Sequence, residues 1–300
     1  MWYDLHVHST NSDGKYSKID LLEISRKNDI QVIAFCDHND CSNLNSKKIY
    51  EEYKEKYGKE SKTLIIPAIE ISAKSEKYRG IHILGYGIRD IDKMQKKIDE
   101  INKKNLSALH RQIKLINKEF NIPITIEMIE KIANKENLNS EDIEKTLMYI
   151  GIIKEKREMY KFTNKDSKSH VNKEKMSDKE AIEVIHKSGG IAVLAHPIEL
   201  KKIKDNSELG SDLEYEEYIQ YLKNVGIDGI ETHTIKHSKE EQQIYFKIAR
   251  KFNLLTTAGT DFHDETRTPQ IGVDYNPNIF LKPLLNKIIN KSKEKEGEER

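Results

Sequence analysis

The sequence predicts an α/β fold in which buried strands alternate with amphipathic helices. Short apolar runs rich in Ile and Val recur along the chain, and such runs are typical of buried strands. Amphipathic segments that begin at a serine precede several of these runs. Helix-then-strand alternation on both sides of the chain indicates an α/β layer or barrel with parallel strands.

The expected strands are seven apolar runs bounded by polar residues: 3–7, 31–35, 64–71, 81–86, 191–195, 227–231 and 254–258. Helices are expected to begin at Ser17, Ser177 and Ser238, each of which is followed three residues later by Asp or Glu. This spacing lets the two side chains satisfy free backbone N–H groups of the first turn. The second of these helices should end at Gly189, because glycine is the usual residue after a helix C-terminus.

We expect three parts: a discontinuous α/β domain, a helical insertion and a charged, disordered tail. Their bounds are 1–91 with 178–285, 92–177 and 286–300, respectively. In the insertion, apolar residues at mostly three- and four-residue spacing predict a long amphipathic helix from Met94 to Pro123. A further helix is expected after Ser140. The tail has almost no apolar residues whose burial could offset the conformational entropy lost on ordering.

Composition excludes several classes of protein. The 300 residues are 36% hydrophobic and 34% charged, yet 51 basic and 50 acidic residues leave a formal charge of +1. This balance argues against a basic footprint for nucleic acid along the whole chain. No apolar stretch approaches the ~18 residues of a membrane span, and the N-terminus lacks a signal-peptide pattern. Two cysteines cannot form a disulfide framework. We expect a cytoplasmic protein without a membrane or an obligate protein partner.

Potential metal ligands lie at or near the ends of successive strands. His6 and His8 are two residues apart, so on an extended segment both imidazoles point to the same face. Asp261 and His263 repeat this spacing after the last strand. The other candidates are Asp13, His38, Glu70, His82 and His196. A single strand-end histidine is more often a hydrogen-bonded core residue, but repetition at strand after strand favours a metal site where parallel strands end.

The motifs resemble those of a known family. They are 3–9, 12–14, 36–40, 67–72, 80–86, 194–197, 229–231 and 259–263, and their order and spacing resemble the PHP family, named for polymerase and histidinol phosphatase. Asp13 and the helical insertion are similar to the branch related to 3′,5′-nucleoside bisphosphate phosphatase and 5′–3′ exoribonuclease. The resemblance implies a distorted (β/α)7 TIM-like barrel with a helical insertion and three metal ions.

Carried over by motif, the resemblance implies three sets of ligands. They are His6, His8, Glu70 and Asp261 for one ion, Glu70, His82 and His196 for a second, and Asp13, His38 and His263 for a third. Glu70, Asp261, His263 and Asp13 are the implied catalytic residues. Mn, Fe or Zn suits this mixture of imidazole and carboxylate, and Mn is favoured. Three divalent ions, three carboxylates and a bridging hydroxide leave a charge of about +2, which suits a phosphate dianion.

The implied activity is that of a metal-dependent phosphoesterase in which a metal-bridging hydroxide attacks phosphorus. The leading expected substrate is the 3′-phosphate of a nucleoside 3′,5′-bisphosphate, a small phosphorylated molecule. Three alternatives stay open: 5′–3′ exoribonuclease action on short RNA, histidinol phosphatase activity, and a non-catalytic module stabilised by its metals. An intact set of strand-end ligands argues against the module, and 300 residues leave no room for a polymerase domain.

Substrate contacts are expected outside the ligands. Arg111, Arg157 and Arg267 are candidate phosphate clamps, because guanidinium binds phosphate through two hydrogen bonds. Any one arginine in so charged a chain is more often solvated. Glu231 and His233 end a strand at the same rim, where Glu231 could bind a ribose or orient a ligand. The segment 140–160 lacks the Gly-Arg-Pro-His-like motif of similar proteins.

Overall fold

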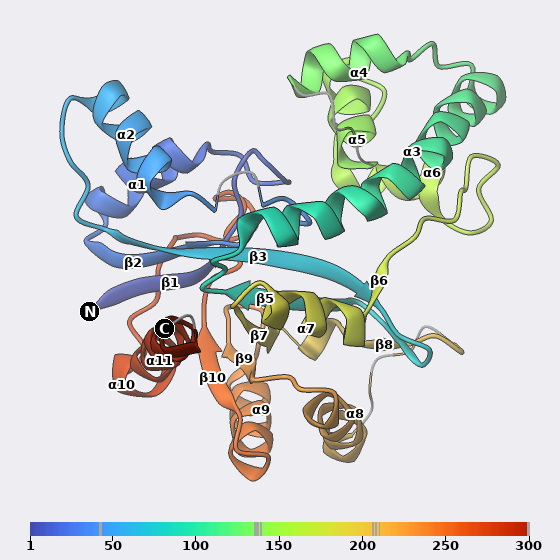
Figure 1. The fold of residues 1–300 in the computed structure, drawn as a ribbon. Coiled ribbons are helices and arrows are strands. Elements are labelled where there is room, and N and C mark those ends of the chain that lie inside the picture. Colours follow the sequence, from blue (N-terminus) through green and yellow to red (C-terminus); the bar gives the residue numbers. More distant parts are fainter. Residues whose placement is uncertain are drawn as a thin grey trace. The chain divides into compact units, whose positions relative to one another are not determined.

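The computed structural model describes residues 1–41, 44–134, 138, 140–205, 207, 209 and 211–298. The chain divides into two compact units (Figure 1), and their bounds are Met1–Gln95 with Met176–Arg300 for the first and Lys96–Lys175 for the second. The first unit is an α/β structure, as the sequence predicts.

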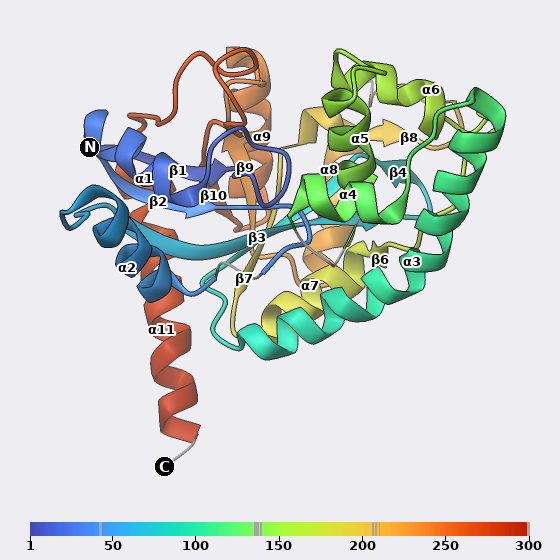
Figure 2. The same cartoon turned by 90° about the horizontal axis from the view of Figure 1, so that it is seen from above.

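One eight-stranded sheet organises the first unit (Figure 2). Its strands follow the order β1 (Trp2–Val7), β2 (Ile30–Phe35), β3 (Leu64–Lys74), β5 (Ile81–Tyr86), β7 (Ile191–Leu194), β9 (Gly229–His233) and β10 (Leu255–Ala258). The short strand β6 (Met176–Ser177) pairs with β3. A separate two-stranded ribbon joins β4 (Tyr78–Arg79) to β8 (Lys201–Lys202). All seven expected strands are therefore present.

Strand direction differs from the prediction at one point. Strands β1, β2 and β3 are parallel, as are β7, β9 and β10. Strand β5 is antiparallel to both of its neighbours, β3 and β7, so the expectation of parallel strands is wrong for β5. The reversal matters for His82, which lies near the start of β5 and pairs with Ser72 of β3. Because β5 runs the other way, its beginning lies at the edge where the parallel strands end.

The two ends of the sheet approach each other, so the sheet is curled. Val7 at the end of β1 forms a parallel bridge with Phe262, just after β10. The backbone N–H of His8 donates to the carbonyl of Phe262 at 2.8 Å. The segments that carry His6, His8 and Asp261 are thereby joined, although they are more than 250 positions apart in the sequence.

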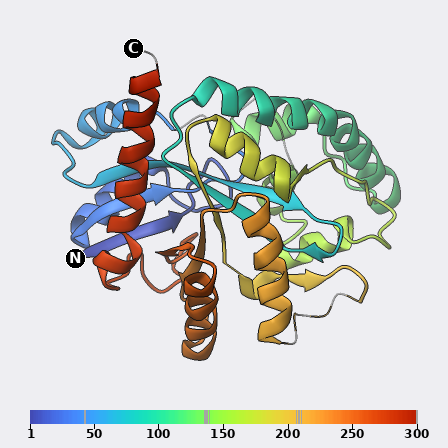
Figure 3. The ribbon, with the colours of Figure 1, turned by 60° about the horizontal axis from the view of Figure 1, so that its bottom comes forward.

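Helices cover the strands, and three of them begin where the sequence predicts. Ser17, Ser177 and Ser238 each accept a backbone N–H as N-cap residues. The α-helices that lie wholly in this unit are α1 (Lys18–Lys27), α2 (Ser46–Tyr57), α7 (Asp178–Lys187), α8 (Asp212–Asn224), α9 (Lys239–Lys251), α10 (Pro277–Phe280) and α11 (Lys282–Glu298). Figure 3 shows α7 and α11 in front of the strands, and α7, α9 and α11 each contact strands.

The segment expected as a disordered tail from residue 286 is helical to Glu298. Leu284 is fully buried in the core beside Leu285 and Ile288. Arg89 donates to Ser292 Oγ at 2.5 Å and to the Lys291 carbonyl at 2.9 Å. The low apolar content of this segment did not indicate a helix. A few apolar residues on one face of its first two turns are enough to hold the helix against the core.

The second unit contains α4 (Ile126–Ala133), α5 (Ser140–Tyr149), η1 (Lys156–Met159) and α6 (Tyr160–Thr163), together with most of α3 (Ile91–Phe120). It has a core of its own in which Leu109, Ile116, Ile143 and Phe162 are buried. Its regular elements are all helical among the residues that the structure describes. No described helix of the chain is both long and apolar enough to cross a membrane.

Candidate metal centre

The nine predicted ligands all lie in the first unit. They come from strands or from the residues just after strands: His6 and His8 with β1, Asp13 on the following loop, His38 after β2, Glu70 in β3, His82 in β5, His196 after β7, and Asp261 and His263 after β10. Their nitrogen and oxygen atoms form overlapping groups in which every member lies within 4.8 Å of the others. The structure thus brings all nine together.

The most buried group surrounds one oxygen each of Glu70 and Asp261. His6 Nε2 lies 3.3 Å from Glu70 Oε2 and 3.5 Å from Asp261 Oδ1. His8 Nε2 lies 3.2 Å and 3.0 Å from the same two oxygens. These four side chains have almost no exposed surface, so their donor atoms face one another in a space closed to bulk water.

The other oxygen of Glu70 faces a second group. His82 Nδ1 and His196 Nε2 each lie 3.0 Å from Glu70 Oε1, and the two nitrogens are 3.3 Å apart. Glu70 therefore offers one oxygen to each group, which is the arrangement of a bridging carboxylate. His38 Nδ1 also lies 3.1 Å from Glu70 Oε2, so His38 borders more of the centre than the single ligand set that the resemblance implies.

The third group is the most exposed. His263 Nε2 lies 3.0 Å from Asp13 Oδ2, and His38 Nε2 lies 3.8 Å from Asp13 Oδ1. The side chains of Asp13, His38 and His82 are 13%, 15% and 21% exposed. Because the remaining candidate ligands are buried, these three residues mark the side on which the centre is exposed to solvent.

The charges of the group favour a cation. Burial lowers the pKa of His8, but Asp261 and Glu70 outweigh burial and raise it to about 10. Burial raises the pKa of Glu70, while His38, His6 and His82 bring it well below the usual range. Without metal, protons on imidazoles therefore balance the carboxylates. A divalent ion would replace those protons, because metal ligands bind in their deprotonated form.

Two buried oxygens show that the residues fit such an ion. Glu70 Oε2 and Asp261 Oδ1 are buried and have no hydrogen-bond partner, although such groups are nearly always satisfied in proteins. Both face the Nε2 atoms of His6 and His8. Imidazole nitrogen with carboxylate oxygen, and no thiolate, is a donor set that suits divalent transition metals.

The outer nitrogen of His6 is held by Glu231. His6 Nδ1 lies 3.0 Å and 3.2 Å from the two oxygens of Glu231, which is fully buried. A metal-binding histidine commonly donates its second N–H to a carboxylate, which fixes the ring and its tautomer. Of the two roles predicted for Glu231, this contact and the burial of its carboxylate fit ligand orientation, which stays a prediction.

Asp37 supports the loop after β1. It accepts hydrogen bonds from the hydroxyls of Ser9 and Ser12, both at 2.8 Å, and pairs with Lys18 at 2.7 Å. Ser12 Oγ in turn lies 3.3 Å from His8 Nδ1. Burial raises the pKa of Asp37, but Lys18 lowers it to about 2. Asp37 therefore contacts the ligand imidazole through Ser12 instead of directly.

Arg267 is the predicted cation that lies beside the described ligands. Its NH1 is 3.5 Å from Asp13 Oδ2, and its side chain is 40% exposed. His233 packs among the rings of Phe246, Tyr275 and Phe280, and burial lowers its pKa to about 4. Its ring is therefore occupied by aromatic packing.

The other two predicted arginines belong to the second unit. Arg111 is exposed on α3, and Arg157 is exposed on η1. Arg157 Nε lies 2.7 Å from Glu155. Both remain predictions for substrate binding.

Lys236 and Glu199 were not predicted. Lys236 Nζ donates to Asp261 Oδ2 and, at 2.5 Å, to Glu199 Oε1. Glu199 Oε2 lies 3.5 Å from His196 Nδ1. The position of Glu199, three residues after His196, was a visible signal in the sequence. Lys236 carried none, because it is one of 51 basic residues and lies in no motif.

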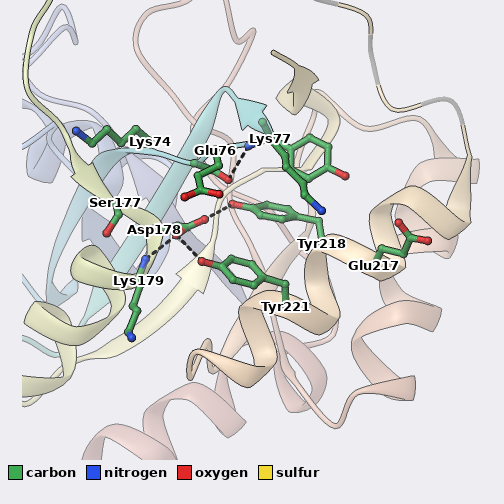
Figure 4. Close-up of a pocket in the computed structure, with 11 residues that line it drawn as sticks. Lys74, Glu76, Lys77, Ser177, Asp178, Lys179, Glu217, Tyr218 and Tyr221 are labelled. Atoms are coloured by element: carbon green, nitrogen blue, oxygen red, sulfur yellow. Dashed lines mark hydrogen bonds between the residues drawn. The ribbon is translucent and has the colours of Figure 1, made fainter. Parts of the chain in front are cut away.

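The described part of the first unit also has a cavity of about 490 Å³ at the far end of β3 (Figure 4). The hydroxyls of Tyr218 and Tyr221 on α8 donate to Asp178 at the start of α7, at 3.1 Å and 3.0 Å. Burial and the nearby Asp178 raise the pKa of Tyr218. None of the predicted ligands lines this cavity, and its polar contacts tie α8 to α7.

Comparison with known proteins gives relatives along most of the chain. A 5′–3′ exoribonuclease from Haemophilus influenzae is 28% identical over 265 residues, which cover 87% of this chain and 89% of that protein. A phosphoribosyl 1,2-cyclic phosphate 1,2-diphosphodiesterase from Eggerthella lenta is 25% identical over 280 residues, covering 90% of this chain and 97% of the relative. No model of a protein family matches the sequence.

Among solved structures, a predicted metal-dependent phosphoesterase from Bifidobacterium adolescentis has a similar fold. Its TM-score is 0.73 at 21% identity, with 96% of each chain covered. The shared fold therefore extends over nearly the whole of both chains. This chain is similar over most of its length to bacterial proteins named as an exoribonuclease and a cyclic-phosphate phosphodiesterase, and the resemblance to phosphoesterases of this kind carried by its motifs is confirmed.

Proposed function

We propose that this protein is a metal-dependent phosphoesterase that hydrolyses phosphate esters of nucleotides, with the 3′-phosphate of a nucleoside 3′,5′-bisphosphate as its leading substrate. The observation that carries the proposal is the position of Glu70. Its two oxygens face two different groups of imidazoles at 3.0–3.3 Å. A bridging carboxylate of this kind is a feature of centres with adjacent metal ions.

Divalent ions in such a centre lower the pKa of a shared water and neutralise phosphoryl oxygens during displacement. The chain's own residues prepare the site for them. Glu231 holds the outer N–H of His6, so that Nε2 faces the centre. Arg267 extends beside Asp13 with 40% of its side chain exposed, where its guanidinium can bind a phosphate through two hydrogen bonds.

A second candidate is stepwise 5′–3′ hydrolysis of short RNA. It is favoured by the exoribonuclease from Haemophilus influenzae, which aligns with 87% of this chain. The same chemistry would serve both candidates, because each breaks a phosphate ester of a nucleotide. They differ in the size of the substrate. A nucleoside bisphosphate has no nucleotides beyond its two phosphates, whereas an RNA has further nucleotides that must also contact the protein.

A panel of substrates with Mn²⁺ separates these candidates. It contains a nucleoside 3′,5′-bisphosphate, a short 5′-phosphorylated oligoribonucleotide, phosphoribosyl 1,2-cyclic phosphate, histidinol phosphate and p-nitrophenyl phosphate. Release of phosphate from the bisphosphate at the highest kcat/KM supports the leading proposal. Release of mononucleotides from the oligoribonucleotide supports the second candidate. Hydrolysis of histidinol phosphate alone would contradict both, and no hydrolysis at all would favour a non-catalytic module.

Glu70→Gln tests whether the centre performs the reaction. The amide keeps the shape of Glu70 but removes the charge that the two groups of imidazoles share. Loss of a residue that only supports a metal ligand costs up to about 100-fold, so loss of this charge should lower kcat/KM at least roughly 100-fold. Glu60→Gln is the control, because Glu60 is an exposed residue paired with Lys54 at 3.0 Å. Equal activity of Glu70→Gln and wild type would rule out hydrolysis at this centre.

A further inference from the structure

We propose that Lys236 is a positioning residue that joins two of the metal-binding groups through Asp261 and Glu199. This inference rests on the proposed function only in requiring that the centre binds metal. One ammonium bridges two carboxylates, each of which contacts a different group of imidazoles. We refer to Lys236 with these two contacts as the Lys236 bridge.

At Asp261, the bridge decides which oxygen faces the centre. Lys236 Nζ donates to Asp261 Oδ2, while Oδ1 lies 3.0 Å from His8 Nε2 and 3.5 Å from His6 Nε2. Oδ1 is buried without a hydrogen-bond partner. The carboxylate thus has one oxygen held from outside and the other free for a metal ion, as expected of a ligand fixed by an outer partner.

At Glu199, the bridge reaches the second group. Lys236 Nζ lies 2.5 Å from Glu199 Oε1, and Glu199 Oε2 lies 3.5 Å from His196 Nδ1. The opposite ring nitrogen, His196 Nε2, faces Glu70 Oε1 at 3.0 Å. Glu199 therefore lies beside the outer nitrogen of His196 as a charged neighbour, without the hydrogen bond that Glu231 makes to His6, and Lys236 holds Glu199 there.

The backbone around Lys236 is anchored. Thr234 and His237 on either side are buried, and the N–H of His237 donates to the carbonyl of Thr234 at 3.1 Å. His237 Nδ1 lies 3.0 Å from the carbonyl of Thr232. With its backbone fixed by this turn after β9, Lys236 loses less conformational entropy in forming the bridge than a lysine on a free loop.

Two physical effects of Lys236 on metal binding have opposite signs. Its positive charge repels a nearby divalent ion, so removing the charge would tighten metal binding if Coulomb repulsion dominated. Its hydrogen bonds orient Asp261 and Glu199, so removing them would weaken metal binding if positioning dominated. The proposal requires the second outcome, and loss of such outer partners typically costs 10–100-fold in metal affinity.

The test is the affinity for Mn²⁺, measured by calorimetric titration of the chelated and dialysed full chain, for wild type, Lys236→Met and Lys236→Arg. We expect Lys236→Met to weaken Mn²⁺ binding about tenfold or more. Lys236→Arg should restore much of the loss, because guanidinium can also bridge two carboxylates. Unchanged or tighter binding in Lys236→Met would overturn the proposal.

Lys202→Met is the matched control. Lys202 Nζ lies 2.6 Å from Glu214, and its side chain is 33% exposed, close to the 35% of Lys236. It should bind Mn²⁺ as wild type does. A loss equal to that of Lys236→Met would show that removing any such lysine weakens the site and would overturn the proposal. If Lys236→Met does not fold, Glu199→Gln and Lys236→Arg decide, since Glu199→Gln must also weaken binding.

The titration separates this inference from the proposed function, because it needs no substrate. Failure of the wild type to hydrolyse any phosphate ester would overturn the function and leave the bridge standing. In an active enzyme, the bridge predicts that raising Mn²⁺ recovers most of the kcat of Lys236→Met with little change in KM. A KM that rises while metal occupancy is complete would assign Lys236 to substrate binding and contradict the positioning role.

Discussion

Glu231 shows at the scale of one residue how a fully buried charge is retained. It comes from β9, on which no ligand lies, yet its two oxygens are 3.0 Å and 3.2 Å from His6 Nδ1. A buried carboxylate costs free energy unless it is paired. Here the partner is a histidine whose other nitrogen faces Glu70 and Asp261, so the pairing also orients the centre.

Glu231→Gln should therefore weaken metal binding without removing a ligand. The amide oxygen can still accept from His6 Nδ1–H, but the charge that strengthens this hydrogen bond is lost. We expect the affinity for Mn²⁺ to fall about 10–100-fold, measured by titration with far-ultraviolet circular dichroism as the check on folding. Glu241→Gln, at an exposed helix cap, is the control. Affinity equal to wild type would show that Glu231 does not orient His6.

The raised pKa of His8 predicts how metal binding depends on pH. Its pKa, raised to about 10 by Asp261 and Glu70 against the effect of burial, means that the metal-free centre is protonated at neutral pH. Manganese must displace that proton, so the apparent affinity should rise from pH 6 to pH 9. Titrations in buffers of different ionisation enthalpy measure the protons released. Release of none at pH 7 would contradict the protonated state.

The raised pKa of His8 also predicts how the stability of the metal-free protein changes with pH. In the folded, metal-free chain the pKa of His8 lies above its value of 6.5 in the unfolded chain. Its contribution to stability is therefore fully present below pH 6.5 and is lost as the pH rises towards 10. Chemical unfolding of the chelated protein at pH 6.5 and pH 9.5 should show lower stability at the higher pH, and equal or higher stability at pH 9.5 would contradict it.

At the scale of elements, most of the fold followed from local patterns. The helix starts at Ser17, Ser177 and Ser238 depend on residues three positions apart, and the strands on short apolar runs. The antiparallel direction of β5 could not be predicted from local patterns, because it depends on which strands become its neighbours in the sheet. The helical state of 286–298 was also missed, since it depends on packing of residues such as Leu284 against distant strands.

The candidate site divides in the same way. Its candidate ligands could be picked out from the sequence because their spacing matches strand geometry, as for His6 and His8. The Lys236 bridge was invisible, because a lysine that turns inward has the same sequence signature as a solvated one. Glu231 was seen at the rim, but whether its carboxylate faced a substrate or His6 depended on the register between β9 and its neighbours.

Gly259 tests the close approach of two such elements. A Cβ at this position would lie 2.6 Å from His6 Cβ and 2.7 Å from the His6 nitrogen, so Gly259→Ala must push β1 away from the segment after β10. We expect a loss of about 1–3 kcal/mol of stability together with weaker Mn²⁺ binding. Thermal unfolding and metal titration of the same samples measure both effects.

Gly58→Ala is the control for Gly259→Ala. Gly58 has open space around its Cβ position and a φ of +64°, so an alanine there costs roughly 1 kcal/mol of backbone strain. Because Gly58 ends α2, away from the ligands, metal affinity should not change. If Gly259→Ala lost stability alone, the contact with His6 would not matter for the centre.

For the whole molecule, the centre is a set of links between segments far apart in the sequence. Its candidate ligands come from β1, β3 and β5 and from the residues after β1, β2, β7 and β10. A metal site made of these residues can form only when the sheet is curled. Metal binding should therefore stabilise the folded first unit, because it favours the folded over the unfolded state.

Removal of metal should lower the melting temperature. An ion present at 100 times its Kd stabilises the folded state by about 2.7 kcal/mol, and each kcal/mol corresponds to roughly 2–4 °C in a domain of this size. We expect a fall of roughly 5–10 °C for one site when EDTA replaces Mn²⁺, measured by differential scanning calorimetry. Glu70→Gln, which cannot bridge two groups, should show a smaller difference. Because the second unit has its own core, a transition that belongs to this unit should not move with metal, and equal shifts of every transition would contradict a centre confined to the first unit.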